Sequence, residues 1–313
     1  MSFSVKSQSS APAFRLTPFR TFVFIVLLWA GIYLPGLGTL QLQHEEPRRA
    51  LPALHMLASG DWLVPRVGSD PYLRKPPLLN WAIALSCKLS GGESEWAVRL
   101  PSVLATFALA VTIVGVAGGR WLGQEGALIA AIFFLANFTM IESGRLAELE
   151  ALYVSLTGIA LVLWMTLWRQ EAGSWQLWLL PAPFLALGML TKGPTHLIFY
   201  YGVVLPVLLF GKDARSLLHP AHLLSLVLVF AALLCWAIPC SLAVSGHKKR
   251  TPHNNHDDKC RFTTLLLSRN MPWVATSWNL TCTDDPCPRS HVFAATICRE
   301  FATVSPFIRV VRT

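Results

Sequence analysis

Residues 151–168 read ALYVSLTGIALVLWMTLW, an apolar run without a charged side chain that lies between Glu150 and Arg169. A hydrocarbon core about 30 Å thick requires roughly 20 predominantly apolar residues in one helix, and this run comes close to that length. Backbone polar groups find no water inside lipid, and the run lacks the apolar/polar alternation of a barrel strand. It is therefore predicted to be a membrane-spanning helix.

Similar apolar runs recur along the chain, each bounded by charged residues. Hydrophobic residues make up 53% of the sequence and charged residues only 14%, whereas an ordinary soluble domain carries about a quarter charged residues. This composition excludes a soluble protein and predicts an all-α, polytopic transmembrane helix bundle over residues 21–246. Seven spans are predicted, in residues 21–40, 100–119, 126–141, 151–168, 172–191, 193–211 and 216–246.

The apolar segment from Pro77 to Gly92 is too short to be counted as a span. Its uninterrupted part covers about ten residues, or about 15 Å of helix, before Lys88 closes it, so an interfacial or re-entrant helix is predicted. If this segment does not cross, the basic residues of the short loops fall on one side, which the positive-inside rule makes cytoplasmic. These residues are Lys6, Arg15, Arg20, Arg120, Arg169, Lys212 and Arg215.

The loop from Gln41 to Trp96 then faces outward, and it carries a basic excess that anionic ligands would explain. The same parity places ionisable side chains from distant segments on one membrane face: Glu45, Glu46, Lys75, Glu142 to Glu150, and Lys192. Ionisable groups at the edge of a bilayer are costly unless they are paired or functional. Each is also compatible with a solvated helix end, but together they predict a pocket that binds an anionic headgroup and supplies a carboxylate base.

The remaining features exclude two further classes of function. The net charge of +9 is spread over loops and the N-terminal tail rather than gathered in a basic stripe, so nucleic acid binding is not expected. His44, His55 and His196 lack paired metal-ligand spacing, so neither a catalytic metal nor a cofactor is predicted. Residues 1–20 are predicted to be a cytoplasmic tail, with a cleaved signal peptide as the alternative.

An ordered set of motifs resembles one family of membrane enzymes. Its members typically read Asp-Glu-x-Arg-Tyr-Ala in the first outward loop, then Met-Leu-x-Ser-Gly-Asp-Trp-x-Val-Pro, then Lys-Pro-Pro. The counterparts here are Glu45, Glu46, Arg48, Arg49 and Ala50, then Met56 to Pro65, then Lys75 to Pro77. Later landmarks are RLPSVL at Arg99 to Leu104, RLAELEALYVSL at Arg145 to Leu156 and GMLTKGP at Gly188 to Pro194. The chain thus resembles the bacterial aminoarabinose (lipid A) transferases and protein O-mannosyltransferases.

The resemblance implies a C-type glycosyltransferase that moves a sugar from a polyprenyl-phosphate donor to a lipid A-type lipid or a protein. The implied place is the outer face of the bacterial inner membrane, among membrane lipids. Family members carry one acidic active-site residue in each of the first two outward loops, at positions that match Glu45 and Glu150. Both are Asp in typical members, and Arg49 replaces the motif's Tyr. The alternative is a degenerate transferase or another non-catalytic polytopic protein.

These matches suggest a role for each charged side chain. Glu45 is predicted to be the base that takes the acceptor's proton or orients the acceptor, assisted by Glu150. Glu46 is a second candidate, and its alternative is to cap locally or to pair locally with Arg49. The leaving polyprenyl phosphate needs cations, and Arg48, Lys75 and Lys192 are predicted to supply them. The alternatives are that Arg48 and Lys75 extend to lipid headgroups and that Lys192 belongs to a helix end.

Residues 247–313 change character abruptly to a polar sequence with dense cysteines. No further span is predicted there, whereas family members usually continue with more membrane helices. A reading-frame shift or a misjoined gene end near residue 246 would produce such an aberrant or disordered tail. The alternative is a small domain held together by disulfides or zinc, built on Cys260, Cys282, Cys287, Cys298, His253 and His256.

Overall fold

The computed structural model describes residues 17–43, 45–68 and 70–250, with the backbone alone for residues 247–250. The chain divides into two units after residue 247, and the elements described here belong to the first unit except for the last residues of the final helix. The predictions for residues 251–313 and for most of the cytoplasmic tail therefore lie outside the described residues.

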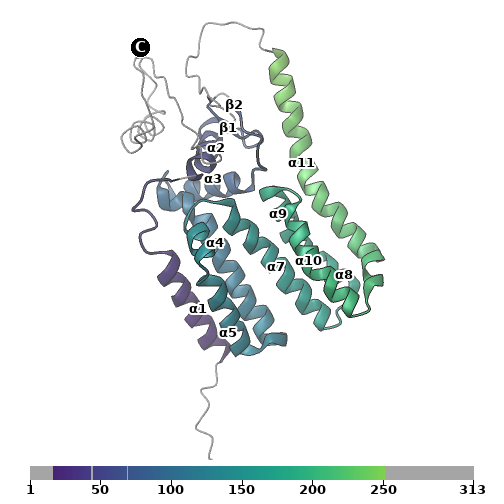
Figure 1. Ribbon diagram of the computed structural model, residues 1–313. Coiled ribbons are helices and arrows are strands. Elements are labelled where there is room, and N and C mark those ends of the chain that lie inside the picture. Colours follow the sequence, from purple (N-terminus) through teal and green to yellow (C-terminus); the bar gives the residue numbers. More distant parts are fainter. Residues whose placement is uncertain (1–16, 44, 69, 251–313) are drawn as a thin grey trace, which may run out of the picture. The chain divides into compact units, whose positions relative to one another are not determined.

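The described ranges are helical apart from one two-stranded hairpin (Figure 1). The elements are α1 (Pro18–Tyr33), α2 (Glu46–Ser59), β1 (Arg66–Val67), β2 (Asp70–Pro71), α3 (Leu78–Ser90), α4 (Glu95–Thr112), the π-helical η1 (Ile113–Leu122), α5 (Gly123–Leu135), α6 (Phe138–Arg145), α7 (Leu149–Arg169), α8 (Ser174–Leu179), α9 (Ala182–Lys192), α10 (Thr195–Phe210), the 3-10 turn η2 (Ala214–Leu218) and α11 (Pro220–Arg250). The all-α prediction is confirmed for these residues.

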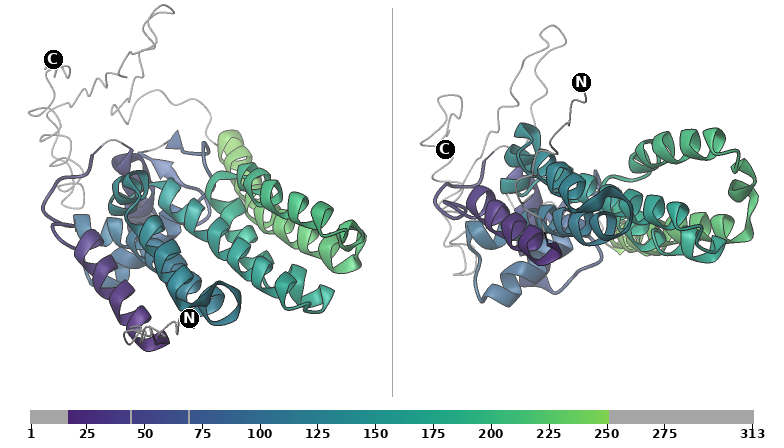
Figure 2. Two further views of the ribbon diagram at one scale, coloured as in Figure 1. Left: turned by 60° about the horizontal axis from the view of Figure 1, so that its bottom comes forward. Right: turned by 90° about the horizontal axis from the view of Figure 1, so that it is seen from below.

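Three buried clusters hold the helices together. The first joins α2 and α3 to the first turns of α4 and α7. The second lies among α1, α4, η1 and α5, and the third joins α7 to α8, α9, α10 and α11. The hairpin packs on α2, and α2 and α3 cover one end of the long helices (Figures 1 and 2). Helices α4 and α7 each contribute to two of the three clusters, and together they connect the clusters to one another.

Three helical segments are long and apolar enough to cross a membrane: Glu95–Leu135, Leu149–Arg169 and Pro220–Gly246. The first contains a reversal, because Gly123 adopts a left-handed φ of 74° and α5 packs back against η1. The shorter apolar helices are Pro18–Tyr33, Leu78–Ser90 and Thr195–Phe210. The count of seven crossings and the interfacial role of residues 77–92 remain predictions.

Two of the predicted spans are interrupted. The run 126–141 breaks at Asn137, whose side chain accepts a hydrogen bond from the Met140 amide at 3.3 Å and so begins a new helix, α6. The run 172–191 breaks at Pro181, because proline lacks the N–H that would continue the helix from α8 into α9. Average hydropathy does not reveal either break, because Asn137 and Pro181 both lie within apolar sequence.

Gly144 in α6 lies where the helix meets α1 and α4 most closely. A Cβ at this position would stand 2.6 Å from Tyr33 Cε1 and 2.9 Å from Thr106 Cγ2. Tyr33 is fully buried and donates a hydrogen bond to the Leu135 carbonyl at 3.1 Å, so its ring has little room to move. We expect Gly144→Ala to lower the free energy of unfolding by about 1–3 kcal/mol through overpacking.

Gly202 in α10 provides the matched control, because a Cβ there would meet nothing within 4 Å. Alanine in an open helical position is expected to be neutral or to stabilise by about 0.5–1 kcal/mol. Both variants are to be unfolded in mixed micelles and followed by tryptophan fluorescence. Equal effects of the two substitutions would contradict the close contact at Gly144.

Candidate active site

Glu46 is fully buried at the start of α2 and accepts four hydrogen bonds. Arg99 of α4 donates two of them, Nε to Oε1 at 2.8 Å and Nη2 to Oε2 at 2.9 Å. The Gln43 amide donates to Oε2 at 2.8 Å, and the Ala147 amide donates to Oε1 at 2.9 Å. Ala147 lies just before α7, so this carboxylate attaches the start of α2 to the start of α7. Of the local roles suggested for Glu46, a cap is present in the Gln43 bond, whereas its ion pair among the described residues is with Arg99 and not with Arg49.

Arg99 completes the same network on its other side. It is 3% exposed, and it donates from Nη1 to the Leu37 and Leu40 carbonyls at 2.6 and 2.9 Å and from Nη2 to the Gln41 carbonyl at 3.0 Å. A single guanidinium therefore holds the loop after α1 against α4. In the sequence Arg99 stands out only as the first residue of the RLPSVL motif, and its role in binding Glu46 and the loop after α1 was not predicted. The signal available was an arginine next to an apolar run.

Glu45 precedes α2 and points away from this buried network. Its carboxylate accepts a hydrogen bond from Arg48 Nη1 at 2.5 Å and lies 3.6 Å from Arg49 Nη2. The Glu45 side chain is 46% exposed. The carboxylate is thus held by two guanidinium groups while nearly half of the side chain is exposed.

Arg49 connects α2 to the loop that carries Lys75. Its Nη1 donates to the Tyr72 hydroxyl at 3.1 Å, and its carbonyl accepts from Asn80 Nδ2 in α3 at 2.8 Å. The Arg49 Nε is buried and finds no acceptor among the described residues. Lys75, between β2 and α3, is partly buried and forms neither an ion pair nor a hydrogen bond in the described part of the chain. It differs in this from Arg48 and Lys192.

Glu150 and Lys192 form the second carboxylate–cation pair. Lys192 Nζ, at the end of α9, lies 2.9 Å from Glu150 Oε1 in the first turn of α7. The ammonium also lies 5.3 Å from the centre of the Tyr153 ring, within cation–π range. Arg49 interacts electrostatically with Glu150, which places α2 and this pair at one end of the bundle. The expectation that Glu150 and Lys192 share a face agrees with this contact.

Comparison with known protein families identifies the family to which the chain belongs. Residues 74–238 match the family model described as dolichyl-phosphate-mannose-protein mannosyltransferase. The match covers Lys75, Glu150 and Lys192 and more than half of the chain. The chain belongs to this family. The resemblance inferred from the motifs is thereby confirmed.

Several curated relatives of this mannosyltransferase-family chain carry the name undecaprenyl phosphate-alpha-4-amino-4-deoxy-L-arabinose arabinosyl transferase. The protein from Edwardsiella ictaluri is 29% identical over 83% of this chain and 49% of its own length. That from Pectobacterium atrosepticum is 31% identical over 80% of this chain and 48% of its own length. The chain spans about half the length of the curated relatives it matches.

The fold has solved counterparts. The crystal structure of ArnT from Cupriavidus metallidurans bound to undecaprenyl phosphate superposes with a TM-score of 0.59 at 23% identity, over 74% of this chain and 42% of that protein. The apo structure of the same protein gives a TM-score of 0.60 at 21% identity, over 77% and 45%. The helical architecture described above is thus a known arrangement.

Two polar groups behind the Glu150–Lys192 pair were not anticipated as part of the site. The Tyr153 hydroxyl and His196 Nε2 are buried and find no partner among the described residues. The two rings meet edge to face with centres 6.3 Å apart, and His196 Nδ1 lies 2.9 Å from the Gly193 carbonyl. Buried polar atoms without partners often receive water or ligand groups. Of the two ring nitrogens of His196, therefore, only Nδ1 lies within hydrogen-bonding distance of an acceptor among the described residues and is satisfied.

His55 lies in α2, where Ser59 Oγ is 3.4 Å from its Nδ1. Burial and the nearby Arg66 guanidinium lower the pKa of His55, an effect that Asp61 partly opposes. His44 lies outside the described residues. Within the described ranges no three His, Cys, Asp or Glu side chains gather in a way that would hold a metal ion.

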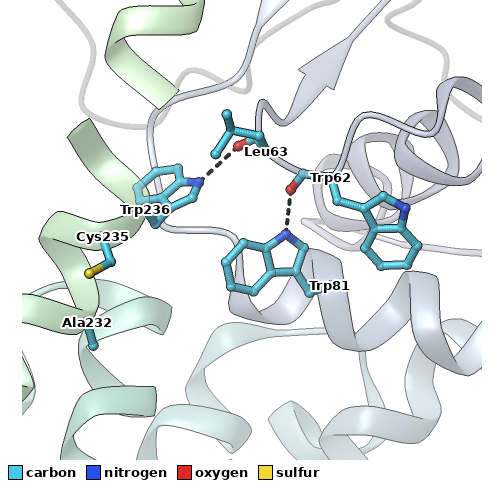
Figure 3. Close-up of a pocket in the computed structure, with 6 residues that line it drawn as sticks. All are labelled: Trp62, Leu63, Trp81, Ala232, Cys235 and Trp236. Atoms are coloured by element: carbon cyan, nitrogen blue, oxygen red, sulfur yellow. Dashed lines mark hydrogen bonds between the residues drawn. The ribbon is translucent and has the colours of Figure 1, made fainter. Parts of the chain in front are cut away.

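An apolar pocket of about 430 Å³ adjoins the loop that leads to Lys75 (Figure 3). Three tryptophans from three segments line it: Trp62 after α2, Trp81 in α3 and Trp236 in α11. Trp81 Nε1 donates to the Trp62 carbonyl at 2.7 Å, and Trp236 Nε1 donates to the Leu63 carbonyl at 3.0 Å. These bonds satisfy the indole N–H groups of Trp81 and Trp236, and most of the remaining lining is apolar.

Proposed function

We propose that this chain transfers a sugar from a polyprenyl-phosphate-linked donor to an acceptor hydroxyl, in a lipid A-type lipid or a protein. The observation that carries the proposal is the gathering of two carboxylate–cation pairs, Glu45–Arg48 and Glu150–Lys192, at one end of a mannosyltransferase-family bundle. The donor named for the curated relatives, an undecaprenyl-phosphate sugar, supports this substrate class.

Glu45 is proposed as the general base. Its carboxylate takes the proton of the acceptor hydroxyl as the oxygen attacks the anomeric carbon, and the bond from that carbon to the phosphate oxygen breaks. Positive charge develops on the sugar in an oxocarbenium-like transition state. Glu150 is proposed to stabilise that charge or orient the acceptor. Glu46 is assigned a positioning role, because all its described contacts are within the protein.

Cations are proposed to stabilise the departing polyprenyl phosphate. Arg48 and Lys192 are already occupied by carboxylates, at 2.5 and 2.9 Å. Lys75 has no such partner among the described residues and lies on the loop beside the tryptophan-lined pocket. We therefore assign the first phosphate contact to Lys75, with Arg48 and Lys192 exchanging partners when the donor binds. The apolar pocket is the proposed location of the first isoprene units, since it offers no polar partner.

Substitution of Lys75 separates donor binding from chemistry. Lys75→Ala is expected to raise the donor KM by about tenfold or more, because one charge-assisted contact to phosphate is lost. Arg74→Ala is the matched control, since Arg74 is a neighbouring cation that is exposed. The measurement is transfer in proteoliposomes at a series of donor concentrations. Equal KM values for the two variants would remove Lys75 from the donor site.

The proposed location is the bacterial inner membrane, with the site facing the periplasm. Lys75 and Glu150 are expected outside and Arg120 inside, because this orientation gathers the basic short loops on the cytoplasmic side. Single cysteines at positions 75, 120 and 150 in a cysteine-free background are to be labelled with an impermeant maleimide. Labelling of positions 75 and 120 from the same side would overturn this topology and the non-crossing assignment of residues 77–92.

The decisive experiment for the function is transfer itself. The full chain is to be reconstituted with polyprenyl-phosphate sugars and tested against lipid A-type and protein acceptors. Transfer to one class identifies the acceptor. An absence of transfer across the panel, with donor binding retained, would favour the non-catalytic alternative that the replacement of Asp by Glu45 and Glu150 suggests.

A further inference from the structure

A second pocket, of about 920 Å³, lies at the end of the bundle away from the proposed active site. Helix α7 connects the two places. Glu150 stands in its first turn and Arg169 is its last residue. A helix of this length separates its ends by about 30 Å, so a group bound beside Arg169 does not reach the proposed catalytic carboxylates.

Three guanidinium groups line this pocket, from Arg120 at the end of η1, Arg169 and Arg215 in η2. Glu171 and Asp213 also line it, yet no ion pair joins either carboxylate to these arginines within the described residues. The three guanidinium groups outnumber the two carboxylates and are not held by them in ion pairs in the described part of the chain, so the concave surface keeps a net positive charge that favours an anion.

One of the three arginines is held in place by its neighbours. The Arg169 guanidinium carbon lies 5.3 Å from the centre of the Trp121 ring, and Trp121 Nε1 donates to Thr166 Oγ1 at 2.9 Å. Such stacking leaves the guanidinium N–H groups at the ring edge able to bind phosphate oxygens. The arrangement reduces the conformational entropy that Arg169 would lose on binding an anion.

The carbonyl groups at the C-terminal ends of α7 and α10 would repel an anion if they lacked hydrogen-bond donors, but several of them accept hydrogen bonds from backbone amides. The Ala172 amide donates to the Leu167 carbonyl at 3.0 Å at the end of α7. The Asp213 amide donates to the Leu208 carbonyl at 2.9 Å at the end of α10. These closures leave the side chains, rather than the helix ends, to set the charge of the pocket.

Because membrane-length helices end beside it, the pocket is expected to lie at the depth where lipid headgroups begin. The membrane-length helix α7 ends at Arg169, the apolar helix α10 ends at Phe210, and the membrane-length segment of α11 begins at Pro220. Trp121 and Trp168 line the same pocket, and tryptophan with arginine is typical of the membrane–water interface. A ligand held here would have its apolar part in the hydrocarbon.

From these contacts we propose that this pocket binds the phosphate of an anionic phospholipid headgroup. Basic pockets between transmembrane helices are suited to such headgroups. Free inorganic phosphate offers the same oxygens to the three arginines, but it lacks acyl chains that would lie along the apolar helices. The site is separate from the proposed transferase centre, and the inference does not depend on transfer activity.

Native mass spectrometry of the full chain in detergent micelles tests the proposal with phosphatidylglycerol as probe and phosphatidylcholine as reference. We expect the parent protein to retain phosphatidylglycerol preferentially. The double variant Arg169→Ala/Arg215→Ala is expected to bind it about thirtyfold more weakly, since each surface arginine is lost as a partner of the anionic headgroup. The Glu171→Gln variant is expected to bind phosphatidylglycerol more tightly than the parent, because a repelling carboxylate is removed while all three arginines remain.

Arg20→Ala provides the matched control, because Arg20 lies near the start of α1, at the same end of the bundle, and does not line the pocket (Figure 1). It should retain phosphatidylglycerol as the parent does. Unchanged binding by the double variant, or equal loss in Arg20→Ala, would overturn the proposal in favour of general surface charge. Displacement of the lipid by inorganic phosphate at equal concentration would overturn the lipid assignment and identify a free-phosphate site.

Discussion

Replacing Arg99 with alanine is expected to lower the free energy of unfolding by about 3–5 kcal/mol. The substitution leaves the Glu46 carboxylate, fully buried, without its charged partner. It also removes the donor to three backbone carbonyls in the loop after α1, those of Leu37, Leu40 and Gln41. A loss of this size is comparable to the whole stability of many domains, so little folded protein should accumulate.

Arg74→Ala is the control for this experiment, because it removes an arginine that is exposed. Both variants are to be unfolded in mixed micelles of a mild detergent and dodecyl sulfate, with tryptophan fluorescence as the signal. If the free energies of unfolding of the two variants differ by less than about 1 kcal/mol, the Arg99–Glu46 pair contributes no more than a surface ion pair does.

A double replacement distinguishes the ion pair from the rest of the network. Arg99→Met with Glu46→Leu removes both charges, a change that is often neutral for an isolated buried pair. Here the Gln43 and Ala147 amides would lose their acceptor, and Ala147 is itself buried. We therefore expect only partial recovery of stability, with a residual loss of about 1–3 kcal/mol. Complete recovery would show that neither the links of Glu46 to Gln43 and Ala147 nor those of Arg99 to the carbonyls of the loop after α1 contribute to stability.

Replacing Glu45 with glutamine is expected to reduce sugar transfer by a factor of about one hundred or more, because the amide does not accept the acceptor's proton. Donor binding should remain within a factor of about three of the parent, because shape is preserved and the phosphate contact is assigned to Lys75. The measurements are single-turnover transfer in proteoliposomes and equilibrium binding of the donor. Glu142→Gln is the control, since Glu142 is an exposed carboxylate in the neighbouring helix α6.

A second test at position 45 changes the length of the carboxylate side chain instead of its charge. Typical family members carry Asp where this chain has Glu45 and Glu150, and a shift of about 1 Å in a catalytic group can cost about a hundredfold in rate. If the longer side chains misplace the carboxylates, Glu45→Asp combined with Glu150→Asp should raise transfer above the parent. If Glu45→Gln transfers as fast as the parent, Glu45 is not the base, whatever the effect of the Asp variants.

Much of the site was accessible from the sequence because charged residues in an apolar chain are conspicuous. Glu150 and Lys192 directly bound apolar runs, Glu45 and Lys75 lie in the loop after the first run, and the parity of the spans placed all four on one face. The contact between Glu150 and Lys192, at 2.9 Å, agrees with that placement. The role of Glu46 was not accessible in this way, because its partner Arg99 is 53 residues further along the chain.

Hydropathy determined that the apolar runs within residues 21–246 form helices, because a long run without charges has few other stable structures in lipid. It did not determine where those helices break, since Asn137 and Pro181 act through a single hydrogen bond and a missing N–H rather than through average polarity. Only the tertiary structure decided which cations are engaged, with Arg48 on Glu45, Arg99 on Glu46 and Lys192 on Glu150. The physical reason is that an ion pair depends on distances of a few ångströms between segments far apart in the chain, and no local pattern records such distances.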